Sequence, residues 1–369
     1  MKYKIPIYQP HLSGNEKKYV NECLESNWIS SKGKFIKEFE DKFSEYIGVK
    51  YATGVTNGTT ALHLALETLG ITEGDEVIVQ TFTYIASVSS ILYTGATPVF
   101  VDSVASTWQM DPEDVKRKIT PKTKAIMAVH LYGQMCDMDE IIKIANENKI
   151  FVIEDCAEAF GSKFKNKYAG TFGNISTFSF YGNKTITTGE GGMLVTNDYY
   201  LYDKAYHFKM HGVSRDREYW HDVIGYNYRM TNICAAIGLA QLEKAEEHIK
   251  LKRKLAKRYN ELLRDLPVTP LKEAKDTVNT YWMYSILVEN VKLRNELREF
   301  LANAGIETRP TFYPVHTMPM FAQKYHKFPV AEDIAIRGIN LPSWPHIPDE
   351  MIIEICNCIG KFYENLKLI

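Results

Sequence analysis

The feature that most restricts the fold of this chain is an alternation of short apolar runs with segments of helical periodicity. The apolar runs are "EVIVQ" (76–80), "TPVFVD" (97–102), "KAIMAVH" (124–130) and "IFVIED" (150–155). Helical patterns occur at 35–47, 58–70 and 137–149, and in the first of them Phe35, Phe39, Phe43 and Ile47 recur every four residues. Strands that alternate with helices favour an α/β fold with a parallel, doubly wound sheet covered on both faces.

The pattern changes in the second half of the chain. A long helical pattern runs from Asn232 to Leu263, and a shorter α/β pattern follows to the C-terminus. A chain of 369 residues is long enough for two domains. We therefore expect a large domain over 15–245 and a smaller C-terminal domain over 246–369, which the N-terminal residues 1–14 join.

Composition excludes several classes of protein. The 44 basic and 45 acidic residues give a net charge of −1, which argues against a nucleic-acid-binding protein. No apolar run approaches the length of a membrane span, and "MKYKIPIYQP" at the N-terminus has no apolar core typical of a signal peptide. The six cysteines are scattered and lack zinc-ligand spacing, so we expect reduced thiols, no metal and a cytoplasmic protein.

A carboxylate is expected at the edge of the sheet where ligands bind. Asp155 closes the apolar run "IFVIED", and ligands of open α/β sheets gather beyond the carboxyl ends of the strands. A helix cap or a salt bridge is the alternative role for this side chain. Tyr84, just after "EVIVQ", should lie at the same edge, where it could stack on a flat ring or simply pack on its neighbours.

A phosphate site is indicated where a strand-like segment gives way to a helix at Gly58 and Thr59. The first turn of a helix offers unpaired N–H groups and the positive end of the dipole, which together bind phosphate. Simple N-capping by Asn57 or Thr59 is the alternative. The sequence contains no Walker loop and no dinucleotide-binding fingerprint.

The segment "SFYGNKTITTGEGG" (179–192) adds a single lysine, Lys184. It could be a surface lysine, or it could bond covalently to a cofactor aldehyde. A phosphate cradle, a stacking aromatic, a strand-end carboxylate and a lysine together describe a pyridoxal phosphate (PLP) site. In such a site the carboxylate keeps the ring nitrogen protonated, and the lysine moves protons on the substrate.

The chain resembles the DegT/DnrJ/EryC1/StrS family of sugar aminotransferases over nearly its whole length. The strings that carry the resemblance are "NGTTALHLAL", "GDEVIVQTFTYIAS", "GATPVFVD", "VIEDCAEAFGS", "TFSFYGNKTITTGEGGMLVTN" and "GYNYRMTNICAAIGLAQLE". The resemblance implies the aspartate aminotransferase fold (fold type I), with a mostly parallel seven-stranded sheet in the large domain and a smaller α/β domain. It also implies PLP as the cofactor.

The resemblance assigns roles to individual residues. Lys184 matches the lysine that bonds to the cofactor, and Asp155 matches the partner of the ring nitrogen. The other cofactor positions are Gly58, Thr59 and Ser179 at the phosphate, Tyr84 against the ring, Glu158 near the ring hydroxyl, and Asn227, which reaches the phosphate from the other subunit. The family therefore implies a homodimer with active sites at its interface, or a tetramer built from such dimers. A related branch that carries out dehydration has histidine in place of the lysine, so Lys184 favours transamination.

Within the family, "WISSKG", "YWHDVIGYNYRMTNI" and "RPTFYPVHTMP" are similar to enzymes that use L-glutamate to aminate GDP-4-keto-6-deoxy-D-mannose for O-antigen synthesis. A UDP- or dTDP-linked 4-keto-6-deoxy sugar is the alternative substrate, and a non-catalytic cofactor-binding protein is an alternative of another class. The candidate substrate contacts are Trp28, Ser30 and Ser31 in a predicted loop, Arg215, and Arg309, Tyr313 and His316 in a proline-rich turn. Helix capping by the serines and salt bridges of the arginines are the structural alternatives.

Overall fold

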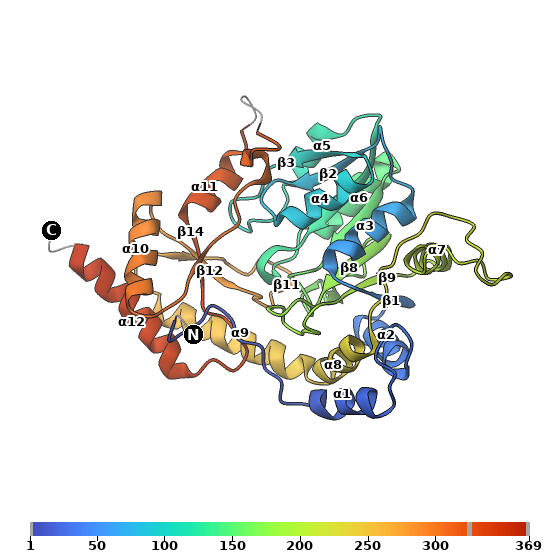
Figure 1. The fold of residues 1–369 in the computed structure, drawn as a ribbon. Coiled ribbons are helices and arrows are strands. Elements are labelled where there is room, and N and C mark those ends of the chain that lie inside the picture. The colour runs from blue at the N-terminus through green and yellow to red at the C-terminus, as the bar shows by residue number, and fades with distance from the viewer. Residues whose placement is uncertain (1–2, 323–326, 367–369) are drawn as a thin grey trace.

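The computed structural model of the chain describes residues 3–322 and 327–366 and is built around a seven-stranded sheet (Figure 1). The strands, in the order in which they lie in the sheet, are β1 (Tyr51–Val55), β9 (Gly192–Thr196), β8 (Ile175–Ser179), β5 (Phe151–Asp155), β4 (Thr123–Val129), β2 (Glu76–Gln80) and β3 (Thr97–Val101). Only β9 runs antiparallel to its neighbours in this sheet. The prediction of a mostly parallel seven-stranded sheet is confirmed.

Helices cover both faces of the sheet, and each face has its own hydrophobic core. One core contains side chains of α2 (Lys34–Ile47), α5 (Pro112–Lys118), α6 (Met138–Asn148) and α8 (Asn232–Glu243). The other contains side chains of α3 (Gly58–Leu69), α4 (Ile85–Tyr93) and α7 (Tyr199–Lys209). The strand side chains alternate between the two cores, as expected for a sheet buried on both sides.

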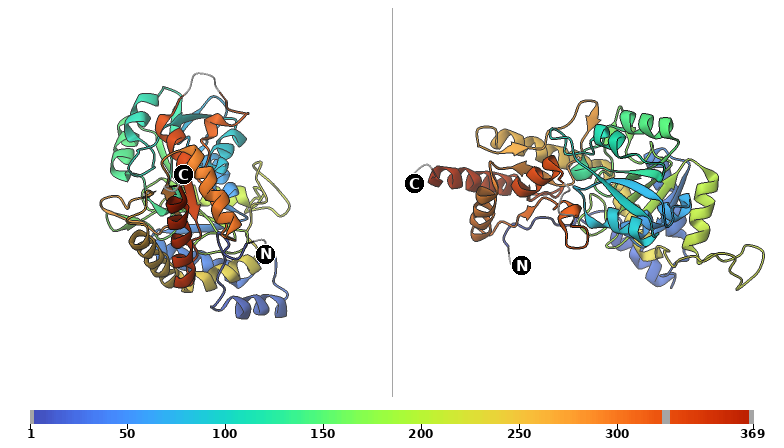
Figure 2. Two further views of the ribbon diagram at one scale, coloured as in Figure 1. Left: turned by 90° about the vertical axis from the view of Figure 1, so that its left-hand side faces the viewer. Right: turned by 90° about the horizontal axis from the view of Figure 1, so that it is seen from above.

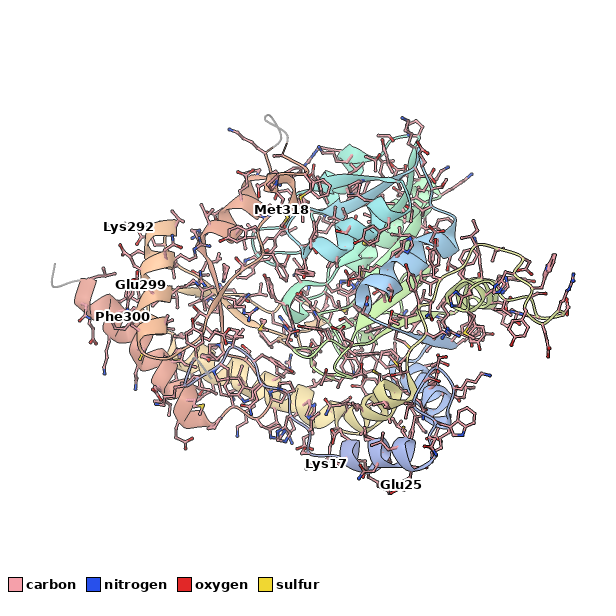
Figure 3. All side chains as sticks on the ribbon, in the orientation of Figure 1. Lys17, Glu25, Lys292, Glu299, Phe300 and Met318 are labelled. Atoms are coloured by element: carbon pink, nitrogen blue, oxygen red, sulfur yellow. The ribbon has the colours of Figure 1, made fainter. Side chains whose placement is uncertain are left out.

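The four-residue periodicity of α2 forms a buried stripe. Phe35, Phe39, Phe43 and Ile47 are each at most 2% exposed. The ring of Phe43 packs 5.0 Å from that of Phe178 on β8, so α2 is anchored directly to the sheet. Charged side chains face outward on the outer helices, such as Lys17 and Glu25 on α1 (Glu16–Glu25) and Lys292 and Glu299 on α10 (Val291–Asn303) (Figure 3).

A second, smaller region lies beside the large sheet (Figure 2). Its four-stranded antiparallel sheet has the order β10 (Thr269–Pro270), β12 (Tyr284–Leu287), β14 (Gly338–Leu341) and β13 (Arg309–Pro310). It packs with α10, α11 (Pro329–Arg337) and α12 (Asp349–Leu366). Ile5, near the N-terminus, pairs with Ile306 in this region.

The helical pattern of 232–263 forms two helices, α8 and α9 (Ala245–Leu262), which are separated at Lys244. Ile249 of α9 belongs to a core of the large sheet, whereas Leu255 and Tyr259 belong to the core of the smaller region. Helix α9 therefore connects the two regions, and its start coincides with the domain boundary that we propose at 245/246.

The remaining short elements are a three-stranded antiparallel sheet of β11 (Thr277–Val278), β6 (Lys163–Phe164) and β7 (Lys167–Tyr168), and two 3₁₀ turns, η1 (Leu131–Gly133) and η2 (Val315–Thr317). The six cysteines are free thiols. Across residues 3–322 and 327–366, no helix has the length and apolar character needed to cross a membrane.

The buried stripe of α2 predicts a large effect of core truncation. We expect Phe43→Ala to lower the free energy of unfolding by about 3–5 kcal/mol, because it removes a buried ring and leaves a cavity. Leu24 on α1 is 55% exposed, so Leu24→Ala should change that free energy by less than about 0.5 kcal/mol. Urea denaturation compares the two variants, and equal losses would contradict the packing described for α2.

Candidate active site

A buried carboxylate marks the carboxyl end of β5. Asp155 is 4% exposed, and it accepts hydrogen bonds from the Ser87 hydroxyl (2.7 Å) and the Ala157 N–H (3.1 Å). No lysine, arginine or histidine within residues 3–322 and 327–366 forms an ion pair with it. The carboxylate is thus held in place by neutral donors, and it is available to pair with a cationic group of a ligand.

Lys184 follows β8 and lies at the same site. Its Nζ is 4.0 Å from Glu158 Oε1 and 4.0 Å from the ring centroid of Trp282. Its backbone is fixed because the Lys184 N–H donates to the Tyr181 carbonyl (2.9 Å). The Lys184 carbonyl in turn accepts from the Tyr8 hydroxyl (2.6 Å).

The electrostatics of the site act in opposite directions on its acids and its base. Burial lowers the pKa of Lys184, while the negative charges of Glu158 and Asp155 oppose that shift. Burial raises the pKa of Glu158 to about 7; Lys184 and a hydrogen bond from the Tyr132 N–H (2.9 Å) oppose this rise, and Asp155 adds to it. Such mutual shifts are typical of groups that exchange protons in catalysis.

The start of α3 forms the expected anion cradle. The Asn57 side chain accepts from the Thr60 N–H, which makes Asn57 the N-cap. The N–H groups of Gly58 and Thr59 have no hydrogen-bond partner within the described residues. A Cβ added to Gly58 would lie 2.7 Å from the Ser179 Cβ, so only glycine lets the helix start this close to the end of β8. Two free N–H groups, the helix dipole and the Ser179 hydroxyl together suit a phosphate.

Tyr84 lies at the same sheet edge, where it caps α4. Its side chain is 59% exposed, and its ring centroid is 5.8 Å from that of Phe312. A flat ring that is half supported and half exposed can stack on a planar ligand.

These residues fit PLP. When bound, PLP supplies an aldehyde that bonds to amines and a ring that withdraws electrons from the bonded carbon. The N terminus of α3 and Ser179 would hold its phosphate, Asp155 its ring nitrogen, and Lys184 its aldehyde carbon. The fit rests on the unpaired N–H groups of Gly58 and Thr59 and on a buried carboxylate that forms no ion pair within the described residues.

The structure places Gly58 next to Ser179 and Lys184 next to Glu158, and Asn227 takes part in neither contact. Asn227 lies on an exposed segment after α7, where its Oδ1 accepts two hydrogen bonds from the Arg229 guanidinium (2.8 and 3.0 Å). Its contact with the cofactor phosphate stays a prediction, since it requires a second subunit.

The substrate candidates are scattered over the molecule. Trp28, Ser30 and Ser31 do lie in the loop between α1 and α2, and Trp28 is 55% exposed. The Ser30 and Trp28 carbonyls hold Asn232, the first residue of α8, through its N–H (2.6 Å) and its side-chain amide (2.7 Å). The N-cap of α2 is Gly33, so these serines do not cap that helix, and the loop is held through its backbone.

The cationic candidates have partners of their own. Arg215 pairs with Asp203, and Arg309 pairs with Glu307 (3.2 Å), both at exposed positions. Tyr313 is 49% exposed. Exposed ion pairs are weak, so each arginine could leave its carboxylate partner and bind a diphosphate instead. Both arginines and Tyr313 therefore remain candidates for substrate contact.

His316 is placed differently from an exposed ligand contact. It is 5% exposed, and its Nδ1 lies 2.7 Å from the Thr81 hydroxyl and its Nε2 3.2 Å from Glu332 Oε1. His316 of η2 therefore contacts Thr81, just after β2, and Glu332 of α11. These contacts favour a structural role for His316 over direct contact with a substrate.

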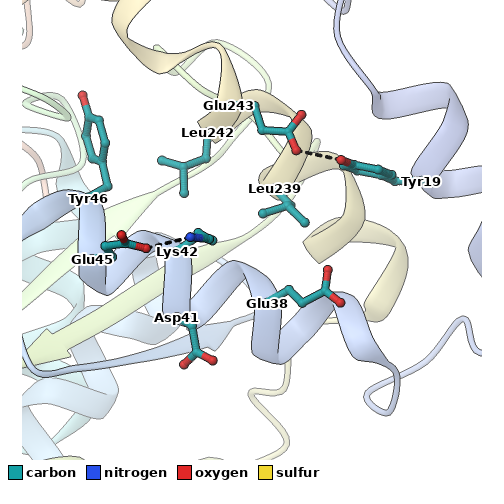
Figure 4. Close-up of a pocket in the computed structure, with 9 residues that line it drawn as sticks. All are labelled: Tyr19, Glu38, Asp41, Lys42, Glu45, Tyr46, Leu239, Leu242 and Glu243. Carbon is teal, nitrogen blue, oxygen red and sulfur yellow. Dashed lines mark hydrogen bonds and ion pairs between the residues drawn. The ribbon is translucent and has the colours of Figure 1, made fainter.

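A groove on the outer face of α2 and α8 is a poor candidate for a nucleotide-sugar site (Figure 4). Its lining comprises Tyr19, Glu38, Asp41, Lys42, Glu45, Tyr46, Leu239, Leu242 and Glu243. Four carboxylates against one lysine would repel a diphosphate. The groove also shares no residue with the site around Lys184.

A buried cluster on the other side of β5 includes three groups that could ligate a metal. They are His130, Glu154 and Cys156. Glu154, however, already accepts hydrogen bonds from the N–H groups of Gly170, Phe172 and Gly173 and from the Ser176 hydroxyl, and it pairs with His130. Its oxygens are fully engaged, so the cluster serves the fold rather than a cation.

Four residues of the site were missed by sequence reasoning. Ser87 lies in the quoted string "TFTYIAS", so its proximity to Tyr84 was the one available signal. Tyr8, Tyr132 and Trp282 gave none, because they come from an N-terminal strand-like segment, a 3₁₀ turn and a loop of the smaller region.

Comparisons with known proteins agree with this geometry. The model of the DegT/DnrJ/EryC1/StrS aminotransferase family matches residues 10–360. A GDP-perosamine synthase of Escherichia coli O157:H7 is 64% identical over 99% of this chain and 100% of its own length, and one of Vibrio cholerae is 52% identical over 97% and 99%. Among solved structures, Spr1654 of Streptococcus pneumoniae in its PLP form has a TM-score of 0.93 at 29% identity, with 98% of this chain and 99% of that chain covered.

The pKa shift of Glu158 predicts how stability depends on pH. The unfolded carboxyl loses its proton near pH 4.5 and the folded one near pH 7, so in this window the folded chain binds more protons and loses stability as the pH rises. The Glu158→Gln apoprotein lacks this titrating group. As the pH rises through this window, we expect its free energy of unfolding to increase by about 1–3 kcal/mol relative to that of the unchanged chain.

Chemical denaturation at stepped pH measures this difference. Glu147→Gln, at an exposed position of α6, is the matched control and should show no such gain. A stability difference for Glu158→Gln that stays flat from pH 4.5 to 7 would contradict the shifted pKa.

Proposed function

The chain belongs to the DegT/DnrJ/EryC1/StrS aminotransferase family, and from this we propose that it is a PLP-dependent nucleotide-sugar aminotransferase that makes GDP-perosamine. The reaction transfers the amino group of L-glutamate to C4 of GDP-4-keto-6-deoxy-D-mannose. Full-length identity of 64% and 52% to GDP-perosamine synthases supports this substrate and a role in O-antigen biosynthesis. The observation that carries the chemistry is the Lys184 amine, which lies 4.0 Å from Glu158 Oε1 and 4.0 Å from the Trp282 ring centroid and feels the charge of Asp155.

Lys184 is proposed as the catalytic base and acid. Burial lowers its pKa, so a larger share of the amine is neutral and able to take a proton near neutral pH. It would remove the proton from Cα of glutamate and later deliver a proton to C4 of the sugar. Glu158, with a pKa of about 7, would accept or return a proton beside it.

The same pocket must serve both substrates. One lysine acts on the amino donor and on the keto sugar, so 2-oxoglutarate must leave before the sugar nucleotide enters. The physical consequence is ping-pong kinetics. Asp155, held by Ser87 and Ala157, would keep the positive charge on the cofactor ring nitrogen through both halves.

We further propose that the active unit is a homodimer in which Asn227 reaches the phosphate site of the partner. The segment between α7 and α8 projects from the body of the protein (Figure 2). It exposes large apolar side chains, with Tyr219 97% and Ile224 92% exposed. Apolar groups of this kind on a projecting segment are typical of a protein–protein contact.

Replacement of the lysine tests the chemistry. We expect Lys184→Ala to lose the visible absorbance of lysine-bound cofactor and to turn over at least about 10²–10⁴-fold more slowly, because it lacks the proton carrier. Lys122, at an exposed turn before β4, provides the control Lys122→Ala, which should retain both properties. Normal turnover by Lys184→Ala would refute the mechanism.

Product analysis tests the substrate. Mass spectrometry should detect an amino sugar nucleotide from GDP-4-keto-6-deoxy-D-mannose with glutamate and PLP. UDP- and dTDP-linked 4-keto-6-deoxy sugars serve as competitors, and preferential amination of either would replace the GDP assignment. A protein that forms the absorbance band but aminates none of them would be a cofactor-binding protein rather than an enzyme.

Subunit complementation tests the shared site. We expect Lys184→Ala and Asn227→Asp to be inactive alone, the latter because an added carboxylate repels the phosphate. In a mixed dimer one site would receive both unaltered residues, so co-expression should restore about a quarter of the activity. No recovery in a mixed dimer confirmed by mass spectrometry would place Asn227 outside the partner's site.

A further inference from the structure

A second buried lysine, Lys252, lies on the buried face of α9. It is 0% exposed, and the buried positions around it on the helix are His248, Ile249, Leu255, Ala256 and Tyr259. No carboxylate within the described residues forms an ion pair with it. A buried amine without a counter-ion is costly, so its retention calls for a specific set of partners.

The partners of Lys252 are two backbone carbonyls from distant segments. Its Nζ donates to the Trp282 carbonyl (2.9 Å) and to the Ser343 carbonyl (2.6 Å). Its Nζ also lies 5.9 Å from the ring centroid of Tyr8. Burial lowers the pKa of Lys252 to about 7. A neutral amine keeps two N–H groups, so both carbonyls remain paired after the proton is lost.

The Trp282 carbonyl lies in a segment that reaches the active site, and the Ser343 N–H donates to the carbonyl of Ile7, the residue before Tyr8 (3.0 Å). The segment of Trp282 follows Tyr281, whose φ of 51° is in the left-handed region that non-glycine residues rarely adopt. The Trp282 indole N–H donates to the Asn183 carbonyl (2.7 Å), and the ring faces Lys184 Nζ at 4.0 Å. Tyr8, next to Lys252, donates its hydroxyl to the Lys184 carbonyl (2.6 Å).

From this geometry we propose that Lys252 is a positioning residue for the active-site lysine: by binding the Trp282 carbonyl it fixes the aromatic face on which the Lys184 nitrogen rests. The chain of contacts runs from α9 through the Trp282 backbone and ring to Lys184. An aromatic face stabilises a positive charge on a nitrogen above it. The position of Trp282 therefore sets how readily the Lys184 nitrogen keeps its proton. This inference rests on the role proposed for Lys184.

The test is a double-mutant cycle on the holoenzyme with a spectroscopic readout. Lys252→Met keeps the length and apolar stem of the side chain but removes both donors. Trp282→Leu removes the aromatic face. The readout is the visible absorbance band of the lysine-bound cofactor, measured as a function of pH. The midpoint of this titration reports the loss of the proton from the Lys184 nitrogen, and it does not depend on turnover.

We expect Lys252→Met to lower that midpoint by about 0.5–1 pH unit, because the nitrogen loses the support of the ring. We expect kcat to fall about tenfold through the misplaced amine, with KM for glutamate changed less than about threefold. The double variant Lys252→Met/Trp282→Leu should show the same midpoint as Trp282→Leu alone, since the two residues act through one contact.

Lys209 provides a matched control. It is also buried (3% exposed) and donates to a backbone carbonyl, that of Gly54 (2.9 Å), but it pairs with Glu40 and has no contact with Trp282. Lys209→Met should lower the melting temperature without moving the midpoint. If Lys252→Met does not fold, Lys252→Gln, which keeps a shorter amide donor, should shift the midpoint in the same direction by a smaller amount.

The outcomes separate this inference from the proposed function. An unchanged midpoint in folded Lys252→Met, or additive shifts in the double variant, would overturn the positioning role. If Lys184→Ala in the same assay kept its visible band, the role of Lys184 itself would fail, whatever Lys252 does.

Discussion

The site depends on two adjacent carboxylates that close β5 and point to opposite faces of the sheet. Successive side chains of a strand alternate, so Glu154 and Asp155 enter different environments. Glu154 is 0% exposed and accepts from three N–H groups, a hydroxyl and His130. Burial favours its neutral form, but His130 and the backbone donors outweigh that effect and hold its pKa below the usual range. An ionised, fully bonded carboxylate thus fixes the end of β5, and with it the direction of Asp155.

The large sheet supplies the fixed charges, and both regions supply the aromatic surroundings. Tyr132 of η1 stacks with Trp282 (6.2 Å between centroids) and with Phe312 (5.4 Å), and its hydroxyl accepts from the Phe312 N–H (3.0 Å). Through Trp282 this column of rings borders the Lys184 amine at 4.0 Å and limits its exposure to water. Exclusion of water is what lets a lysine lose its proton easily and lets a glutamate keep its own.

The sequence predicted site residues best where their role follows from their position at the end of a strand or the start of a helix. A carboxylate at a strand end and N–H groups at a helix start are local consequences of the fold, so Asp155, Gly58 and Thr59 could be placed before any coordinates. The segment 179–192 drew attention to Lys184, and the resemblance to a known family supported its role and added the seven-stranded sheet. Trp282, Tyr8 and Lys252 could not be found in this way, because their contacts join distant segments, up to 176 residues apart in the hydrogen bond from Tyr8 to Lys184, and follow no periodicity. His316 shows the converse case, since a polar residue in a proline-rich turn looks exposed in sequence but is buried between β2 and α11.

The contacts of Lys252 also explain why a helix that belongs to both regions carries a buried lysine without a counter-ion. Helix α9 packs Ile249 into the core of the large sheet and Tyr259 into that of the smaller region, so it fixes the distance between them. An apolar side chain at position 252 would leave the Trp282 and Ser343 carbonyls without donors, and a carboxylate there would repel them. An amine is the one common side chain that is long enough, donates to two carbonyls and can shed its charge when buried. The length of the side chain and its ability to shed its charge also qualify Lys184 for chemistry, and its nearby carboxylates, which Lys252 lacks, distinguish a catalytic amine from a structural one.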